Sequence, residues 1–182
     1  MQDSVDAKID ETTLRRKWRA EYVDAFLAQV GVVKNSLGPS TRKCLDDWAR
    51  QVQLVEAQPS ANWGNAILNL CRAVESELSS MGKISGLDFM KSKQALGSKA
   101  QSLKRFKPDP SVKQAVTNRG IKPGFVFSSL ADLLSKLADV RAKTDSAHGG
   151  LEIGTATKKD AEEARQLGGK ILVGIVSRGP GT

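Results

Sequence analysis

The 182-residue chain contains one histidine and two cysteines, and aromatic residues make up only 5% of it. A single histidine and two isolated cysteines, Cys44 and Cys71, cannot supply a zinc site with ordinary ligand spacing. The cysteines are therefore expected to be reduced thiols. No run of about 18 apolar residues occurs, so no membrane span is predicted, and the polar start of the chain is unlike a secretory signal. These absences favour a cytoplasmic protein that needs no metal or other cofactor.

Apolar residues form 40% of the chain, enough for a core, and most recur at the three- and four-residue spacing of helices. This spacing predicts an all-α protein with long helices over residues 11–32, 40–57, 62–80, 127–148 and 157–177. Shorter helices are expected over 89–103 and 111–118. Trp18 and Trp48 should attach the first two helices to the others. Thr157 and Asp160 are placed to form a capping box, and Gly168-Gly169 indicates a close approach of another helix.

The positive charge is concentrated in one part of the sequence. Residues 81–122 contain ten basic and two acidic side chains, an excess that equals the formal net charge of +8 for the whole chain. We divide the chain into an N-terminal helical region, 1–60, and a helical bundle, 61–182, with a basic insert at about 81–126. A cluster of cations is the expected footprint of a polyanion binder. The candidate nucleic-acid-binding residues are Lys99, Lys104, Arg105, Lys107 and Lys113.

One alternative to a polyanion binder remains for the basic insert. The insert can be a solvated segment that only keeps the protein soluble. Few aromatic residues, Phe89 and Phe106, lie among its charges, which argues against a platform for stacked bases. No glycine-rich phosphate-binding motif lies between a strand and a helix. The sequence thus favours contacts to phosphates over reading of bases.

The only histidine, His148, follows a strongly patterned apolar run and precedes two glycines. If the helix of that run continues, Leu134, Arg141 and His148 advance by sevens and fall on one face. Polar residues at positions where the pattern expects apolar ones often mark functional sites. A simpler interpretation is a surface ion pair between Arg141 and Asp145, with His148 placed favourably at a helix C-terminus.

Arg141, six intervening residues and His148 resemble the R-x4-6-H motif of the HEPN superfamily. The likeness is closer to the C-terminal domains of bacterial abortive-infection proteins, where a helix end similar to Val140-Arg141-Ala142-Lys143 is followed by His-Gly, as in His148-Gly149. Residues 161–176 resemble the closing helix of that family, and 65–78 resemble its early core helix. The resemblance covers about residues 61–80 and 127–177.

This resemblance implies an up-and-down helical bundle, here with an N-terminal helical extension, that forms a homodimer with two motifs facing each other. It also implies a metal-independent endoribonuclease of a toxin or phage-defence system, with a possible cognate antitoxin. The catalytic residues would be Arg141 and His148, and Asp145, Lys143 and Ser146 would be auxiliary polar residues. RNA carries its own nucleophile, the 2′-hydroxyl. A histidine can transfer the protons near neutral pH, and an arginine can hold the phosphate oxygens.

One residue of the motif departs from the family pattern. Ala142 follows the arginine, where active members often carry Asn, Asp or His. This departure favours a competing hypothesis, a non-catalytic HEPN-like module that binds nucleic acid or protein. The intact Arg141 and His148 favour the nuclease.

Overall fold

The computed structural model describes residues 3–58, 62–91, 94–144 and 156–176, with side chains from residue 11 onward. All regular elements in these ranges are helical, which confirms the predicted all-α class. The α-helices are α1 (Asp3–Val30), α2 (Pro39–Glu56), α3 (Gly64–Met81), α4 (Leu96–Arg105), α5 (Pro110–Asn118), α6 (Leu130–Ala142) and α7 (Lys158–Ile175). Three short segments complete them: the 3-10 helices η1 (Lys34–Ser36) and η2 (Asp88–Lys91), and the π-helix η3 (Phe125–Ser129).

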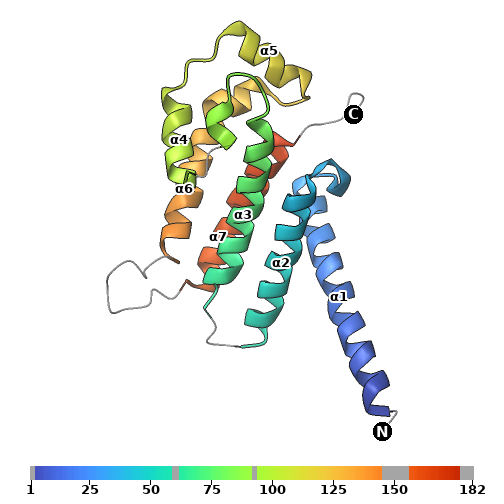
Figure 1. Ribbon diagram of the computed structural model, residues 1–182. Helices are drawn as coiled ribbons and strands as arrows, with labels where there is room; N and C mark the ends of the chain where they lie inside the picture. Colours follow the sequence, from blue (N-terminus) through green and yellow to red (C-terminus); the bar gives the residue numbers. More distant parts are fainter. Residues whose placement is uncertain (1–2, 59–61, 92–93, 145–155, 177–182) are drawn as a thin grey trace.

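Helices α2, α3, α6 and α7 form the main bundle, with α1 along α2 and α7 and with α4 against α6 (Figure 1). Helix α5 lies at the end of the bundle opposite the start of α3 (Figure 1). The buried apolar side chains form one cluster to which every α-helix contributes. The regions 1–60 and 61–182 therefore share a core. None of the helices described has the length and hydrophobicity required to cross a membrane.

Aromatic side chains attach α1 to α2, whereas Trp18 and Trp48 were expected to attach these two helices to the others. The Trp48 ring is 2% exposed and lies 5.1 Å from the Tyr22 ring and 4.9 Å from the Phe26 ring, between centroids. Trp18 is only partly buried and stacks on Tyr22 of its own helix at 4.9 Å. Aromatic pairs at such distances stabilise a core by about 0.5–1.5 kcal/mol beyond the area they bury.

The two neighbouring glycines of α7, Gly168 and Gly169, face side chains of α3 and α1, respectively. A Cβ atom added at Gly168 would be 3.3 Å from the Leu70 side chain of α3. At Gly169 it would be 2.5 Å from Cγ1 of Val30 on α1. The prediction that these glycines permit a close helix approach is thereby confirmed, and it explains why a helix tolerates their low propensity.

Three predicted helix boundaries are wrong. The short helix expected over 89–103 is instead the 3-10 helix η2 and the α-helix α4, which begins at Leu96. Helix α1 begins at Asp3, whereas the apolar pattern indicated a start near Glu11. Helix α6 ends at Ala142 and does not continue to residue 148. After α6, the Thr144 side chain donates a hydrogen bond of 2.7 Å to the Arg141 carbonyl, a local contact that competes with further helix. The predicted continuous helix up to residue 148 is therefore wrong, and the position of His148 relative to Arg141 lies outside the described residues.

Candidate functional site

Arg141 lies in the last turn of α6 and contacts α3. Its Nη1 is 2.6 Å from Oε1 of Glu75, and each side chain is 26% exposed. The pair is therefore partly shielded from water, where an ion pair is stronger than on an open surface. Only Nη1 contacts Glu75 in this pair, and a guanidinium has five N–H donors in all. The side chain is thus oriented by Glu75 and keeps donors for another anion.

Three of the residues proposed for this site, Asp145, Ser146 and His148, lie outside the described residues. The described chain stops at Thr144 and resumes at Ala156, and both of these residues contact the start of α3. The Ala156 carbonyl accepts a hydrogen bond of 3.0 Å from the Trp63 amide. A hypothetical Cβ atom added at Gly64 would lie 3.5 Å from Cβ of Thr144, so the two backbones are close together. The two ends of the segment that contains His148 are therefore fixed at the same end of the bundle as Arg141.

Lys143, the fourth polar residue singled out with the motif, connects α6 to the first turn of α7. Its Nζ is 2.7 Å from Oδ1 of Asp160. Asp160 also accepts from the backbone and hydroxyl of Thr157, which completes the predicted capping box. The hydrogen bond from Lys143, followed by those from Thr157, holds the pKa of the Asp160 carboxyl well below its ordinary value. The Asp160 hydrogen bond in turn raises the pKa of Lys143.

A small hollow lies beside this end of α6. It measures about 150 Å³ and is lined by Asn62, Gly64, Asn65, Leu68 and Thr144. Helices α3 and α7 both begin at this end of the bundle, where α6 ends (Figure 1). The first turns of helices carry a partial positive charge, which favours anions, although the Gly64 amide of α3 is already paired with Asn62 and the Asp160 amide of α7 with Thr157. The surroundings of Arg141 are therefore compatible with a phosphate group.

The cations of the basic insert differ in exposure more than the sequence indicates. Lys99 is 2% exposed, and its Nζ donates a hydrogen bond of 2.7 Å to the Met90 carbonyl. Burial lowers the pKa of this amine. Lys104 contacts Asp132 at 3.0 Å. Lys99 thus supports the packing of α4 on η2 and is not presented to a ligand in this structure.

The remaining three candidates in the insert, Arg105, Lys107 and Lys113, are exposed on and between α4 and α5. Among the described residues they have no ion-pair partner within 4.0 Å. They lie far from Arg141, because Lys104 contacts Asp132 at the start of α6 and Arg141 is at its end. Nine residues of helix separate those positions, about 13 Å along the axis. The structure therefore pairs Arg141 with Glu75, whose charge also acts on the buried Lys99, whereas Lys143 binds Asp160 on α7 and the exposed cations of the insert lie elsewhere.

Sequence reasoning did not identify Glu75 as a neighbour of Arg141. The only signal in the sequence is that Glu75 lies on the polar face of a helix whose other face is apolar. This position does not specify which residue Glu75 contacts. Among the described residues, no group of three or more His, Cys, Asp or Glu side chains is arranged to hold a metal ion.

Comparisons with family models, curated proteins and solved structures yield no significant match to this chain.

Proposed function

We propose that this chain is a HEPN-like, metal-independent endoribonuclease that acts in the cytoplasm as part of a bacterial defence or toxin system. The observation that carries the proposal is the placement of Arg141. Its guanidinium is partly exposed, is oriented by Glu75, and lies at the bundle end where the segment containing His148 begins. In the sequence, His148 follows Thr144 by four residues, a chain length that spans at most about 14 Å.

The proposed chemistry needs only groups that the chain contains. His148 removes the proton of the RNA 2′-hydroxyl or protonates the leaving 5′ oxygen, because an imidazole titrates near neutral pH. Arg141 holds the phosphate oxygens as negative charge develops on them. Since each chain has a single histidine, the base and the acid would come from two chains of a homodimer. The products would be a 2′,3′-cyclic phosphate and a free 5′-hydroxyl.

Glu75 has a defined place in this proposal. It contacts one of the terminal nitrogens of Arg141 at 2.6 Å and thereby limits the rotamers of a long side chain. A phosphate would bind the remaining N–H donors of Arg141, either beside the Glu75 carboxylate or by displacing it. The bidentate geometry of a guanidinium is specific, and lysine cannot reproduce it.

A second candidate is a non-catalytic module that binds RNA through Arg105, Lys107 and Lys113. The exposure of these three cations, without an ion-pair partner among the described residues, favours it. Ala142, where active HEPN members often have a polar residue, is compatible with it as well. A partner protein such as an antitoxin would then use the Arg141 end of the bundle.

One assay separates the two candidates. Purified wild type is incubated with RNA or with single-stranded DNA of the same sequence in a chelating buffer, beside His148→Ala and Arg141→Lys. Arg50→Lys is the matched control, because Arg50 is an exposed arginine on α2. The nuclease predicts cleavage of RNA only, with a loss of about 10²–10⁴-fold in His148→Ala, a large loss in Arg141→Lys and none in Arg50→Lys. RNA that is bound but left intact by wild type would support the binding module.

The binding surface is tested by charge reversal. Replacing Arg105, Lys107 and Lys113 by Glu should weaken RNA binding and flatten its dependence on salt, because fewer counterions are released. The control reverses three exposed cations of α1 and α2, Arg16, Lys43 and Arg50. Equal losses in the two triple variants would show that net charge alone governs binding and would remove this surface from the proposal.

A further inference from the structure

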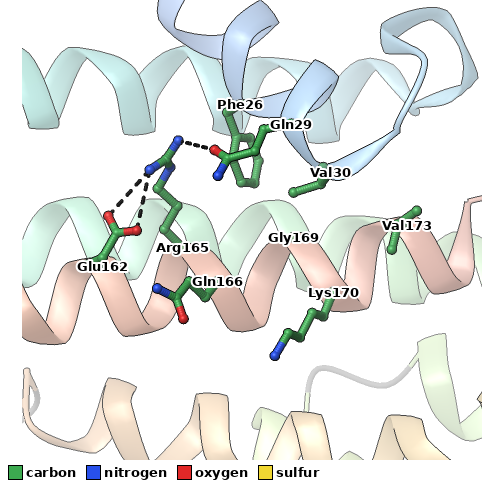
Figure 2. A pocket seen from close by; sticks show the side chains of 9 residues that line it. All are labelled: Phe26, Gln29, Val30, Glu162, Arg165, Gln166, Gly169, Lys170 and Val173. Carbon is green, nitrogen blue, oxygen red and sulfur yellow. Dashed lines mark hydrogen bonds and ion pairs between the residues drawn. The ribbon is translucent and has the colours of Figure 1, made fainter.

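A hollow of about 410 Å³ lies between α1 and α7 (Figure 2). None of its lining residues belongs to α3, α6 or the basic insert, so it is separate from the Arg141 region. Its volume is within the range of about 300–1,000 Å³ that is typical of sites for small organic ligands. The proposed nuclease makes no use of it.

The floor of the hollow is apolar because α1 ends there and leaves apolar surface of α7 partly uncovered. Gly169 allows Val30 to approach α7, with 2.5 Å between Val30 Cγ1 and a hypothetical Cβ. Helix α1 then stops at Val30, and the chain turns away at Gly31, whose φ is +75°. Val173, one turn further along α7, is left only partly covered. Val30 and Val173, both partly exposed above the buried Phe26 ring, provide a surface for an apolar ligand body (Figure 2).

One wall of the hollow carries a fixed cation. The Nη2 of Arg165 donates a hydrogen bond of 2.6 Å to Oε1 of Gln29, and its guanidinium lies 5.7 Å from the centre of the Phe26 ring. Its carboxylate neighbour, Glu162, is 3.4 Å from Nη1, at the long limit of a hydrogen bond. Because each terminal nitrogen has two hydrogens, the guanidinium retains donors for a stronger acceptor.

A second cation, Lys170, also lines the hollow, and its side chain extends on the side of α7 away from α1, as does that of Gln166 (Figure 2). Lys170 is exposed and has no acidic partner within 4.0 Å among the described residues. Two cations and one carboxylate, that of Glu162, leave this hollow with one net positive charge. An apolar floor beside these cations complements a molecule that has an anionic head and an apolar body.

We propose that the hollow between α1 and α7 binds a small amphiphilic anion, a carboxylate joined to an alkyl or aryl body. The carboxylate contacts Arg165, the body covers Val30 and Val173, and Lys170 adds positive charge at the edge of the hollow. Neither the proposed nuclease nor a dimer is required for this binding.

The test uses a fluorescent aryl sulfonate, 8-anilinonaphthalene-1-sulfonate, as the probe and three competitors with the same alkyl chain. Decanoate should displace the probe at a concentration at least about tenfold lower than decan-1-ol or decyltrimethylammonium, because only decanoate carries a negative head group. Competition by decan-1-ol that equals competition by decanoate would overturn the proposal, since the cations would then have no role.

Two variants locate the binding. Lys170→Glu should weaken probe binding by about tenfold or more, and the matched control Lys159→Glu, an equal charge change on the same helix outside the hollow, by less than about twofold. Val173→Trp should fill the hollow and also weaken binding. Circular dichroism checks that each variant is folded. Equal effects of Lys170→Glu and Lys159→Glu would contradict the site, and because both are surface changes, this comparison does not depend on the behaviour of Val173→Trp.

Discussion

Replacement of Glu77 by alanine should destabilise the fold strongly, although Glu77 contacts α2 and not Arg141. Glu77 is on α3 and only 7% exposed. Its Oε2 accepts 2.7 Å and 3.2 Å hydrogen bonds from the Thr41 hydroxyl and the Gly38 amide, both in the first turn of α2. The N-cap residue of α2, Gly38, provides no side-chain cap of its own. Glu77 therefore caps α2 from a neighbouring helix.

The magnitude follows from the groups that lose their acceptor. A buried donor left without a partner costs about 1–3 kcal/mol; the Thr41 hydroxyl is fully buried, whereas the Gly38 amide is partly open to water. We expect Glu77→Ala to lower the free energy of unfolding by about 3 kcal/mol, which corresponds to a fall in melting temperature of about 6–12 °C for a chain of this size. Urea and thermal denaturation followed by circular dichroism measure both quantities.

A partner variant makes this reasoning refutable. Thr41→Val removes the hydroxyl and keeps the shape of the side chain, so Glu77→Ala should cost about 1–2 kcal/mol less in that background than in the wild type. Glu56→Ala, at an exposed glutamate of α2, serves as the control and should change stability by less than about 0.5 kcal/mol. The proposed cap would be refuted if the stability losses of Glu77→Ala and Thr41→Val simply added in the double variant. A loss below about 1 kcal/mol for Glu77→Ala alone would also refute it.

Asp160→Asn should reduce stability at neutral pH by about 1 kcal/mol. Because the pKa of Asp160 is lowered in the folded state, this difference should persist above about pH 4 and shrink as the pH falls below that, which urea denaturation across pH will measure. A double-mutant cycle of Arg141→Gln and Glu75→Gln should give a coupling energy of about 1 kcal/mol, and a value near zero would argue against the ion pair. Gly169→Ala should cost about 1–3 kcal/mol in urea denaturation, because the new methyl group overlaps a neighbouring side chain; a neutral result would contradict the close packing.

Periodicity in the sequence was sufficient to predict the helices because most of their buried residues recur at helical spacing. Thr157 and Asp160 are correctly predicted to cap α7, since a capping box depends on four neighbouring positions. The end of α6 was harder to predict. The apolar pattern remains compatible with helix up to Ala147, but the Thr144 hydroxyl bonds to the Arg141 carbonyl just after α6 ends. A local competition of this kind leaves no trace in the spacing of apolar residues.

The other features that the sequence did not predict are contacts between side chains of different helices. Lys99 is one of several lysines in the basic insert, and it is buried only because α4 packs on the rest of the molecule. The partner of Arg141, Glu75, is 66 residues away in the sequence. Such pairs depend on how helices pack side by side, which one sequence does not specify. The chemistry assigned to Arg141 and His148 stays a prediction.

The ends of the RNA fragments test the central proposal most directly. Wild-type protein is incubated with a defined RNA in a chelator, and the products are analysed by mass spectrometry beside those of His148→Ala. Attack by the 2′-hydroxyl predicts fragments that end in a 2′,3′-cyclic phosphate, lighter by one water than a linear phosphate, from the wild type alone. Intact RNA with the wild type, or identical products and rates with His148→Ala, would contradict the proposed nuclease.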